Sequence, residues 1–594
     1  MTAYQTLEQR FSRLAALEGA AGILGWDAQT LMPDGAAEAR GDQLAILRGL
    51  AHEILTAPET RDELAAAEQQ GGLDTWNAAN LREMRRAQAH AGAVPRDLVE
   101  ASSRAVSRSE MVWREARRDS DFARLAPYLA EVLRLQREIG QAKGAALGLD
   151  PYDALLDSYD PGMRRAVIDP LFTDLTSWLP DLIARAREIQ ASRPAPLPLE
   201  GPFDTGTQRA LGLKLMTALG FDFARGRLDI SLHPFCGGAT DDVRITTRYD
   251  EADFGRALMG VLHETGHALY EQGRPAAWRH QPVGAARGMS LHESQSLIVE
   301  MQACRSREFF TYLAPLLRDA FGRSGPEWSP ENLHALNTQV RPGFIRVDAD
   351  EATYPAHILL RYQLETAMIA GDLAVADLPG AFNDGLRDLL GLTVPEDRLG
   401  CLQDIHWPSG AFGYFPTYTL GALAAAQLFR AARAAEPALP GCLAAGDFAP
   451  LRTWLRANVH EVGSLLGTDD LLVRATGAPL GTAAFRAHLE GRYLGGEGSI
   501  TAGAGTRRAP PPQRQRAFLQ RSGVLMGRNV PAAAIEGSQT ERSLASSSRG
   551  HAVEPGIQNH RRLKDLHGRR FWIPGSPAAP RNDGEVYPPP SRQL

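Results

Sequence analysis

The sequence predicts a mainly α-helical fold. From Tyr4 to about Arg193, apolar residues recur every three or four positions with charged residues between them, which is the pattern of amphipathic helices. The pattern resumes at Phe254 and is lost after about Gly495. The 594 residues are 44% hydrophobic and 23% charged, so the chain has a globular composition and can bury one large core or several. A fibrous, wholly disordered or small disulfide-stapled protein is excluded.

Two short segments interrupt the helices. Residues 194–202 contain four prolines, each of which removes a backbone donor and stops a helix. We therefore expect a loop there between two helical halves, 1–200 and 201–495. In residues 243–248, Val, Ile and Thr alternate with Arg and Thr, and Gly237-Gly238 lies upstream between two extended stretches. This pattern predicts a short antiparallel β-hairpin.

The last part of the chain differs from the rest. The net charge is −6, but residues 501–594 carry +9 and the first 500 residues carry −15. Pro, Arg, Ser, Gly and Gln dominate this part, and such a composition buries too little apolar surface to offset the entropy of ordering. We expect residues 496–594 to be a disordered basic tail after a catalytic domain formed by residues 1–495. The acidic domain offers no basic surface to nucleic acid, whereas contacts of the tail with polyanions stay open.

Cysteine spacing and hydropathy predict where the protein works. The four cysteines lie far apart and form no CxxC pair, which indicates reduced thiols rather than a zinc knuckle or a disulfide framework. The best apolar run, Leu420 to Phe429, is about half of the roughly 20 residues that a bilayer requires. Residues 1–13 carry charges of both signs, with no long apolar segment after them. We expect a cytoplasmic protein without a membrane segment.

A candidate metal motif lies in the helix predicted over residues 254–273, which has Asp250 or Asp253 as its N-cap. His263-Glu264-Thr265-Gly266-His267 is an HExxH sequence, whose two histidines stack on one face of the helix because they are four residues apart. Both imidazoles can then reach one ion, with Glu264 beside it and directed toward a bound water. On the motif alone, two hydrogen-bonded core histidines are the alternative.

A hydrolytic zinc site needs a third protein ligand and an open position. Glu293 is the best candidate, because it opens an amphipathic stretch after a loop rich in glycine and proline that can turn the chain back. The alternative candidates, each of which also has an ordinary structural role, are His292, Glu271, His280 and Glu300. The set His263, His267 and Glu293 predicts one zinc ion per chain, with cobalt kept open because both metals accept imidazole and carboxylate ligands.

This set of side chains predicts amide or peptide hydrolysis. Zinc lowers the pKa of its bound water from 15.7 to about 7. Glu264 is the predicted general base, which takes the proton of that water and returns it to the leaving amine. A nearby donor must stabilise the oxyanion, an interaction that contributes about 3–4 kcal/mol.

Further motifs follow in order around this site. They are His233-Pro234-Phe235, Asp242-Val243-Arg244-Ile245-Thr246, His292-Glu293-Ser294, Ile345-Arg346-Val347-Asp348-Ala349-Asp350 and Gly400-Cys401-Leu402-Gln403-Asp404-Ile405-His406-Trp407. Together with HExxH and the opening Leu24-Gly25-Trp26-Asp27, they resemble the carboxypeptidase Taq family of metallocarboxypeptidases over about residues 6–495.

The resemblance implies a helical metallopeptidase fold with a deep central groove and a small sheet beside the active site, usually as a homodimer. It implies that His263, His267 and Glu293 bind the metal and that Glu264 is the catalytic base. It also implies that Arg346 holds the terminal carboxylate of a peptide, so that single C-terminal residues are released with broad specificity. A guanidinium pairs bidentately with a carboxylate, which suits an exopeptidase.

Other residues of these motifs have more than one possible role. Arg346 can instead form a salt bridge with Asp348 or Asp350. Arg244 positions the substrate backbone or pairs with Asp242.

Three aromatic or imidazole side chains are further candidates. His233 and His406 stabilise the oxyanion, orient the metal ligands, or are ordinary buried histidines. Tyr418 is a weaker candidate for the oxyanion donor, and its neighbour Tyr414 stays open.

One position departs from many HExxH enzymes. Residue 297, one turn after Glu293, is Leu, so the carboxylate that commonly orients a ligand histidine from there is absent. Asp348, Asp350 or a backbone carbonyl is expected to take its place. Two other functions stay open, namely a dipeptidyl carboxypeptidase or oligopeptidase of the same architecture and a non-catalytic peptide-binding scaffold.

Overall fold

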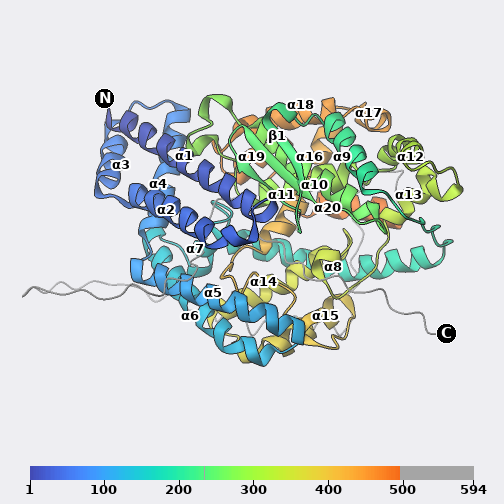
Figure 1. Ribbon diagram of the computed structural model, residues 1–594, viewed down its shortest axis with the longest axis horizontal. Coiled ribbons are helices and arrows are strands. Elements are labelled where there is room, and N and C mark those ends of the chain that lie inside the picture. Colours follow the sequence, from blue (N-terminus) through green and yellow to red (C-terminus); the bar gives the residue numbers. More distant parts are fainter. Residues whose placement is uncertain (233, 496–594) are drawn as a thin grey trace, which may run out of the picture. The chain divides into compact units, whose positions relative to one another are not determined.

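The computed structural model describes residues 1–232 and 234–495. Its helices in the first half are α1 (Ala3–Thr30), α2 (Ala37–Thr56), α3 (Pro58–Gln70), α4 (Thr75–Gly92), α5 (Arg96–Asp119), α6 (Phe122–Leu147), α7 (Pro151–Leu156), α8 (Arg165–Ala191) and α9 (Thr205–Leu219). Those that follow are α10 (Phe254–Gly273), α11 (Met289–Leu297), α12 (Arg307–Phe321), α13 (Pro330–Asn337), α14 (Tyr354–Ala370), α15 (Leu378–Leu390), α16 (Pro416–Ala435), α17 (Leu439–Ala445), α18 (Ala449–Asn458), α19 (Thr468–Thr476) and α20 (Ala483–Leu494). The predicted mainly α-helical fold is confirmed (Figure 1).

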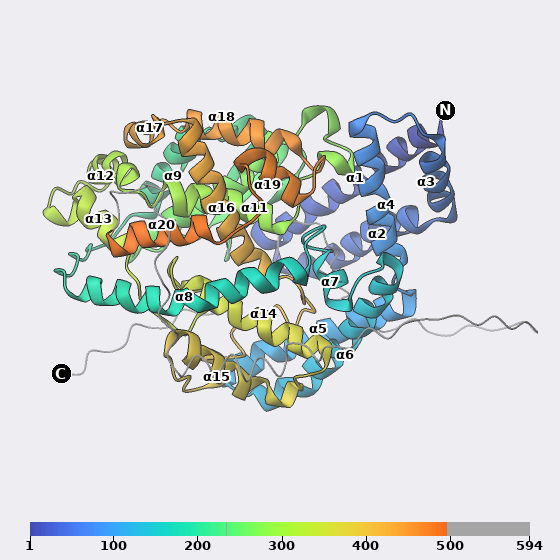
Figure 2. The same cartoon turned by 180° about the vertical axis from the view of Figure 1, so that it is seen from behind.

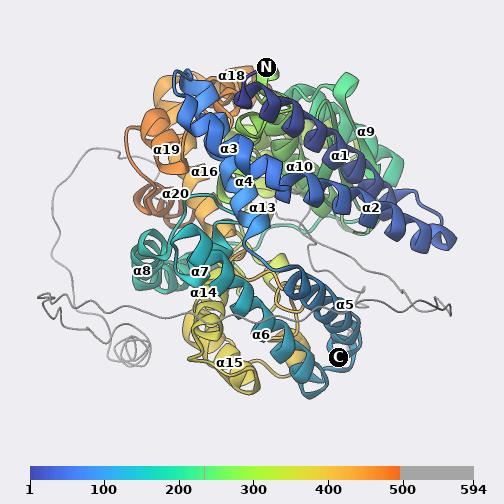
Figure 3. The same cartoon turned by 90° about the vertical axis from the view of Figure 1, so that its left-hand side faces the viewer.

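The helices form two groups that lie one above the other in Figure 3. One group contains α5 to α8 with α14 and α15, and the other contains the remaining helices and the sheet. The view from behind shows the same division (Figure 2). Helix α16 connects the groups, because it packs against α11 and α20 in one and against α14 in the other.

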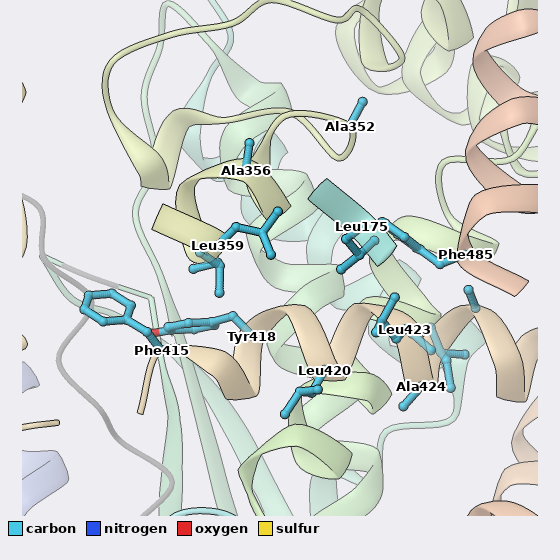
Figure 4. Close-up of a cluster of buried hydrophobic side chains, with 14 of the residues drawn as sticks. Leu175, Ala352, Ala356, Leu359, Phe415, Tyr418, Leu420, Leu423, Ala424 and Phe485 are labelled. Carbon is cyan, nitrogen blue, oxygen red and sulfur yellow. The ribbon is translucent and has the colours of Figure 1, made fainter. Parts of the chain in front are cut away.

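The core around α16 is apolar and closely packed. Leu423 of α16 points to the side on which Leu175 of α8 and Phe485 of α20 lie, whereas Leu420 points from the opposite side of the helix (Figure 4). All four side chains are buried. Burying an apolar side chain of this size contributes about 1.5–3 kcal/mol, so α16 has a well-determined position, which matters because its first turns face the candidate site.

The sheet has three strands rather than the two of the predicted hairpin. β2 (Cys236–Ala239) and β3 (Asp242–Thr247) form the expected antiparallel pair, and β1 (Gly226–Ile230) adds to the other edge of β3 in parallel. The expectation that Gly237-Gly238 separates two extended stretches was wrong, since both glycines lie inside β2 and the turn is Thr240-Asp241. The parallel strand was missed because a parallel partner needs no tight turn to mark it.

One face of the sheet packs on the helix that carries HExxH. Ile245 of β3 and Leu228 of β1 are buried in one apolar cluster with Val261 and Ala268 of α10. The cluster holds α10 against the sheet, with the remaining faces of the helix toward α9 and α11.

The remaining predictions on organisation have different outcomes. Helix α8 ends at Ala191 and α9 begins at Thr205, so the loop predicted from the proline cluster is confirmed. None of the helices in residues 1–232 and 234–495 is long and apolar enough to cross a membrane. The predictions for His233 and for the tail of residues 496–594 lie outside the described residues. The deep groove and the division of the domain into halves stay predictions.

Candidate metal centre and active site

Helix α10 places both histidines of HExxH on one face. Asp253, one of the two expected N-caps, accepts hydrogen bonds from the backbone amides of Gly255 and Arg256 and so begins the helix. The two imidazole rings lie 5.0 Å apart between centroids, as expected for residues one turn apart.

Glu293 reaches these histidines because two glycines let three helices approach closely. A Cβ at Gly266 of α10 would lie 2.5 Å from the carbonyl oxygen of Gln295 and 2.6 Å from Cα of Ser296, both in α11. Likewise, a Cβ at Gly421 of α16 would lie 2.8 Å from Cβ of Glu293. Only glycine fits at these two crossings, which press Glu293 toward the histidines of α10.

Three ligand atoms, one from each of His263, His267 and Glu293, converge within 4.8 Å of one another. Oε2 of Glu293 lies 3.3 Å from Nε2 of His267 and 3.9 Å from Nε2 of His263. Within the described part of the chain, this is the one group of at least three His, Cys, Asp or Glu side chains with the spacing of a metal site. The sequence had selected the same three residues.

The hydrogen bonds behind the histidines determine which nitrogens carry protons. Nδ1 of His263 donates to the Glu300 carboxylate at 2.9 Å, which leaves Nε2 of this ring for a metal. Burial lowers the pKa of His267 to about 3, so the His267 ring is neutral at pH 7. Three electron-pair donors thus face one another, an arrangement that fits a divalent cation and is repulsive without one.

Glu300 is the carboxylate that orients His263. It lies in a π-helical stretch, Ile298–Ala303, that continues α11, and its other oxygen accepts from Arg305 at 2.8 Å. Burial by itself would raise the pKa of Glu300, but Arg305 and His263 outweigh burial and lower this pKa to about 2. The carboxylate therefore stays charged. Glu300 supplies the orienting carboxylate that is missing at residue 297.

The expectation that Asp348, Asp350 or a backbone carbonyl orients a ligand was wrong. Asp348 pairs with Arg256, and Asp350 accepts hydrogen bonds from backbone amides, including that of Arg341. The common pattern places the orienting carboxylate one turn after the ligand glutamate, where this chain has Leu297. Glu300 lies two turns after Glu293, on the same side of the helix.

His267 is oriented by a longer relay. Its Nδ1 lies 2.7 Å from Nδ1 of His292, and Nε2 of His292 donates to Glu271 at 2.9 Å. Arg274 lies 3.0 Å from the other oxygen of Glu271 and, together with His292, lowers the pKa of Glu271 to about 2 against the opposing effect of burial. Because His292 donates from Nε2, its Nδ1 accepts from Nδ1 of His267, which leaves Nε2 of His267 for a metal.

Replacing His292 by Phe is expected to weaken metal binding about 10- to 100-fold, because the relay no longer determines the tautomer and orientation of His267. The measurement is competition for Zn²⁺ between the apoprotein and a chromophoric chelator. His280→Phe is the matched control, since His280 is exposed and takes no part in the relay. Equal affinities of the two variants would contradict the role given to His292.

Glu264 lies in the same turn as His263 and is buried. Its charge is one of the causes, after burial, that raise the pKa of the Cys236 thiol, so its carboxylate lies near strand β2. Glu264 is not one of the three converging residues, and its role as the base stays a prediction.

The segments around Arg346 and Gln403 meet in the structure. The backbone amide of Arg346 donates to Oε1 of Gln403 at 2.8 Å, and its guanidinium donates from Nε to Asp404 at 2.9 Å and from Nη1 to the Tyr354 hydroxyl at 2.9 Å. The alternative prediction, a salt bridge of Arg346 with Asp348 or Asp350, was wrong, because Arg346 forms its ion pair with Asp404. Gln403 and Asp404 lie in a motif that the sequence had singled out without assigning them a role.

The oxyanion candidates lie beside Arg346. Nε2 of His406 lies 3.3 Å from the Tyr418 hydroxyl, and the Tyr418 ring centroid lies 5.2 Å from the Arg346 guanidinium carbon. Tyr414 packs edge-on against Tyr418, with ring centroids 5.3 Å apart. Because Tyr418 and Gly421 are three residues apart on α16, the same face of this helix contacts both Glu293 and Arg346.

Arg244 pairs with Asp242, the alternative left open by the sequence. Its Nε and Nη2 contact the two carboxylate oxygens at 2.9 and 2.6 Å. The guanidinium carbon also lies 4.6 Å from the ring centroid of Trp26 in α1. The contact joins the sheet to the amino-terminal helices, and a role in substrate binding stays a prediction.

A helical fold that brings an HExxH helix and a glutamate of the next helix to one point defines a metallopeptidase. The family model of the carboxypeptidase Taq (M32) metallopeptidases matches residues 6–493 of the chain. The chain therefore belongs to this family and is a metallocarboxypeptidase.

Individual relatives agree with the family. Thermostable carboxypeptidase 1 of Thermus thermophilus is 40% identical over 502 residues, which cover 83% of this chain and 98% of the relative. Among solved structures, metallocarboxypeptidase 1 of Trypanosoma cruzi is 41% identical with a TM-score of 0.81, and the match covers 83% of this chain and 99% of that protein's chain. The M32 carboxypeptidase of Deinococcus radiodurans is 36% identical with a TM-score of 0.79, and the match covers 83% of this chain and 98% of that protein's chain.

Proposed function

We propose that the protein is a metal-dependent carboxypeptidase that releases single C-terminal residues from peptides with broad specificity. The observation that carries the proposal is the convergence of three acceptor atoms from His263, His267 and Glu293. Helix α16 adds support, because the face that contacts Glu293 at Gly421 also contacts Arg346 through Tyr418. A metal site and a cationic group for a terminal carboxylate are thus arranged along one helix.

His263, His267 and Glu293 would hold one Zn²⁺, with Co²⁺ as the alternative that the same ligands accept. Such an ion supplies Lewis-acid polarisation of the scissile carbonyl and activation of water. Glu264 accepts the proton of the attacking water on its carboxylate and passes it to the nitrogen of the leaving amine. Because Glu264 is buried, bulk water does not compete for this proton.

Tyr418 is the proposed donor to the oxyanion. Its hydroxyl lies 3.3 Å from Nε2 of His406, which orients the hydroxyl group. His406 itself is buried, and burial lowers its pKa to about 3, so it acts as a neutral hydrogen-bonding group. The proposal for His233 as a further donor rests on the family resemblance.

Arg346 is the proposed partner of the substrate carboxylate. Its Nε donates to Asp404 and its Nη1 to the Tyr354 hydroxyl, and Nη2 lies 2.9 Å from Oδ1 of Asp404. The side chain is only 2% exposed, so the aromatic side chains around it must move before a carboxylate binds. An internal peptide bond offers no such anion, and the site therefore favours chain ends.

Removal of the metal is expected to abolish activity. The test is hydrolysis of a dipeptide blocked at its amino terminus, measured before and after treatment with a chelator and dialysis, and again after stoichiometric Zn²⁺ or Co²⁺ is returned. The rate of hydrolysis should fall at least about 100-fold when the metal is removed and should recover when it is returned, because the metal is the group that activates water. Undiminished cleavage after verified metal removal would refute the proposal.

The products of a longer peptide distinguish the related activities. Mass spectrometry should show successive loss of single C-terminal residues, and the same peptide with a C-terminal amide should be cleaved much more slowly. Loss of residue pairs or internal cleavage would instead indicate a dipeptidyl carboxypeptidase or an oligopeptidase. Stoichiometric metal and saturable peptide binding without turnover would indicate a scaffold. A homodimer is proposed from the family resemblance, and a cytoplasmic location from the cysteine spacing.

We further propose that residues 1–495 are the complete catalytic domain. The last helix, α20, packs on α16 and buries Leu489 and Tyr493 in the main core, so the core extends to the end of this helix. Truncation after Gly495 is expected to leave the melting temperature and the peptidase activity nearly unchanged. A large drop in the melting temperature would contradict this boundary.

A further inference from the structure

Two buried guanidinium groups share one carboxylate beside the candidate site. Oδ1 of Asp404 accepts from Nε of Arg346 at 2.9 Å, and Oδ2 accepts from Nε of Arg361 at 2.6 Å. Arg346 is 2% exposed, Arg361 is 0% exposed and Asp404 is 4% exposed, so solvent screens none of the three charges. The trio carries one net positive charge in the interior.

Other groups around the trio do not neutralise this charge. Within residues 1–232 and 234–495, Asp404 is the one carboxylate within ion-pair distance of either guanidinium. Phe415 lies between the two, with its ring centroid 5.8 Å from the guanidinium carbon of Arg346 and 5.5 Å from that of Arg361. The other titratable residues that contact the trio are His357, His406, Tyr354 and Tyr418.

The state of these neighbours supports the charge count. Burial lowers the pKa of His357 and of His406 to about 3, so both imidazoles are neutral at pH 7. Burial by itself would raise the pKa of Asp404, but the two guanidinium groups outweigh it and hold this pKa well below its usual range. Arginine does not lose its proton in proteins. The positive charge therefore persists at the pH at which the enzyme works.

Nη2 of Arg346 lies 2.9 Å from Oδ1 of Asp404 and Nη2 of Arg361 lies 2.5 Å from Oδ2, so one carboxylate is the counter-ion of both guanidinium groups. A buried net charge is costly unless a further counter-ion binds to it. If Arg361 were absent, Asp404 would neutralise Arg346 completely, and an incoming carboxylate would meet a neutral pair.

We propose that Arg361 is a specificity-determining positioning residue that engages one oxygen of Asp404 and so leaves the positive charge of Arg346 available to the terminal carboxylate of the substrate. The proposal rests on the proposed function, in which Arg346 binds that carboxylate. Arg361 acts through Asp404 and does not itself touch the substrate. It lies on α14, outside the motifs found in the sequence, and Tyr354 and Arg361 are two turns apart on one face of this helix.

The test compares Arg361→Met, Arg361→Lys and the double variant Arg361→Met/Asp404→Asn with the wild type. The substrate is a blocked dipeptide with a free carboxylate, and the same dipeptide with a C-terminal amide is the reference. For Arg361→Met we expect KM for the acid to rise about 10- to 100-fold with kcat changed less than about threefold, because a charge-assisted bond is weakened away from the reacting atoms. The preference for acid over amide should fall by the same factor.

The other two variants separate charge from shape. Arg361→Lys keeps the positive charge and should have a KM within about fivefold of the wild type. The double variant removes one charge of each sign and restores the net charge of the trio, so its KM should be lower than that of Arg361→Met. A double variant with a higher KM than Arg361→Met, or an Arg361→Met enzyme with an unchanged KM and acid preference, would overturn the proposal.

Two controls keep the result interpretable. Melting temperatures are measured for all variants, and if Arg361→Met does not fold, the double variant and Arg361→Lys still decide between charge and shape. Arg346→Gln tests the proposed function separately. If Arg346→Gln leaves KM unchanged, the proposed function fails, whereas a raised KM in Arg346→Gln with a normal KM in Arg361→Met overturns only the role of Arg361.

Discussion

Glu264→Gln is expected to lower kcat about 10²- to 10⁴-fold, the range that a general base contributes. The amide has nearly the same shape as the carboxylate but accepts no proton from the attacking water. The three converging ligand atoms come from other residues, so the variant should retain its metal. The measurements are kcat for the blocked dipeptide and metal content by elemental analysis.

Glu264→Asp is the informative companion variant. It keeps a carboxylate but withdraws it by one methylene, so its activity should lie between those of the wild type and Glu264→Gln. A Glu264→Gln enzyme with full metal content and a kcat within about threefold of the wild type would show that another group is the base. Loss of metal from this variant would show that Glu264 helps to bind the ion.

Gly266→Ala is expected to damage the fold at the site. The added Cβ would lie 2.5 Å from the carbonyl oxygen of Gln295, a distance at which backbone must move, so α11 is pushed away from α10 together with Glu293. Overpacking of this kind costs about 1–3 kcal/mol. We expect a lower melting temperature and weaker Zn²⁺ binding in the chelator competition.

Gly260→Ala on the same helix is the matched control. There the nearest atom to an added Cβ is Cγ of Pro234 at 3.9 Å, so the methyl group fits without displacement. Because alanine is favoured over glycine within a helix by about 1 kcal/mol, this variant should be as stable as the wild type or more stable. A Gly266→Ala protein with the stability and zinc affinity of Gly260→Ala would show that the α10–α11 crossing does not determine the site.

Local features of the site were predictable from the sequence. The bounds of α10, its N-cap and the common face of His263 and His267 follow from spacing along one helix, which is set by 3.6 residues per turn. The loop at the proline cluster follows from the missing backbone donors of proline. An antiparallel hairpin was also predicted in this region, but Gly237-Gly238 was expected between its extended stretches and lies instead inside β2.

Contacts between distant residues were predicted less well. The sequence named Glu271, His292 and Glu300 only as competing ligands, whereas the structure gives them the task of orienting His263 and His267. The parallel strand β1 was not foreseen. The sequence does not distinguish a carboxylate that binds a metal from one that orients a metal ligand, because that difference depends on packing.

The sequence by itself determined the identity of the three converging side chains and led to Glu264 as the proposed base, since the HExxH spacing and the family motifs are properties of the chain. The tertiary structure alone decided that Asp404 lies between Arg346 and Arg361, residues separated from it by 58 and 43 positions. The physical reason is the range of the forces. Helix geometry acts over four residues, whereas the pairing of buried charges depends on where the packing of α14 and α16 brings their side chains together.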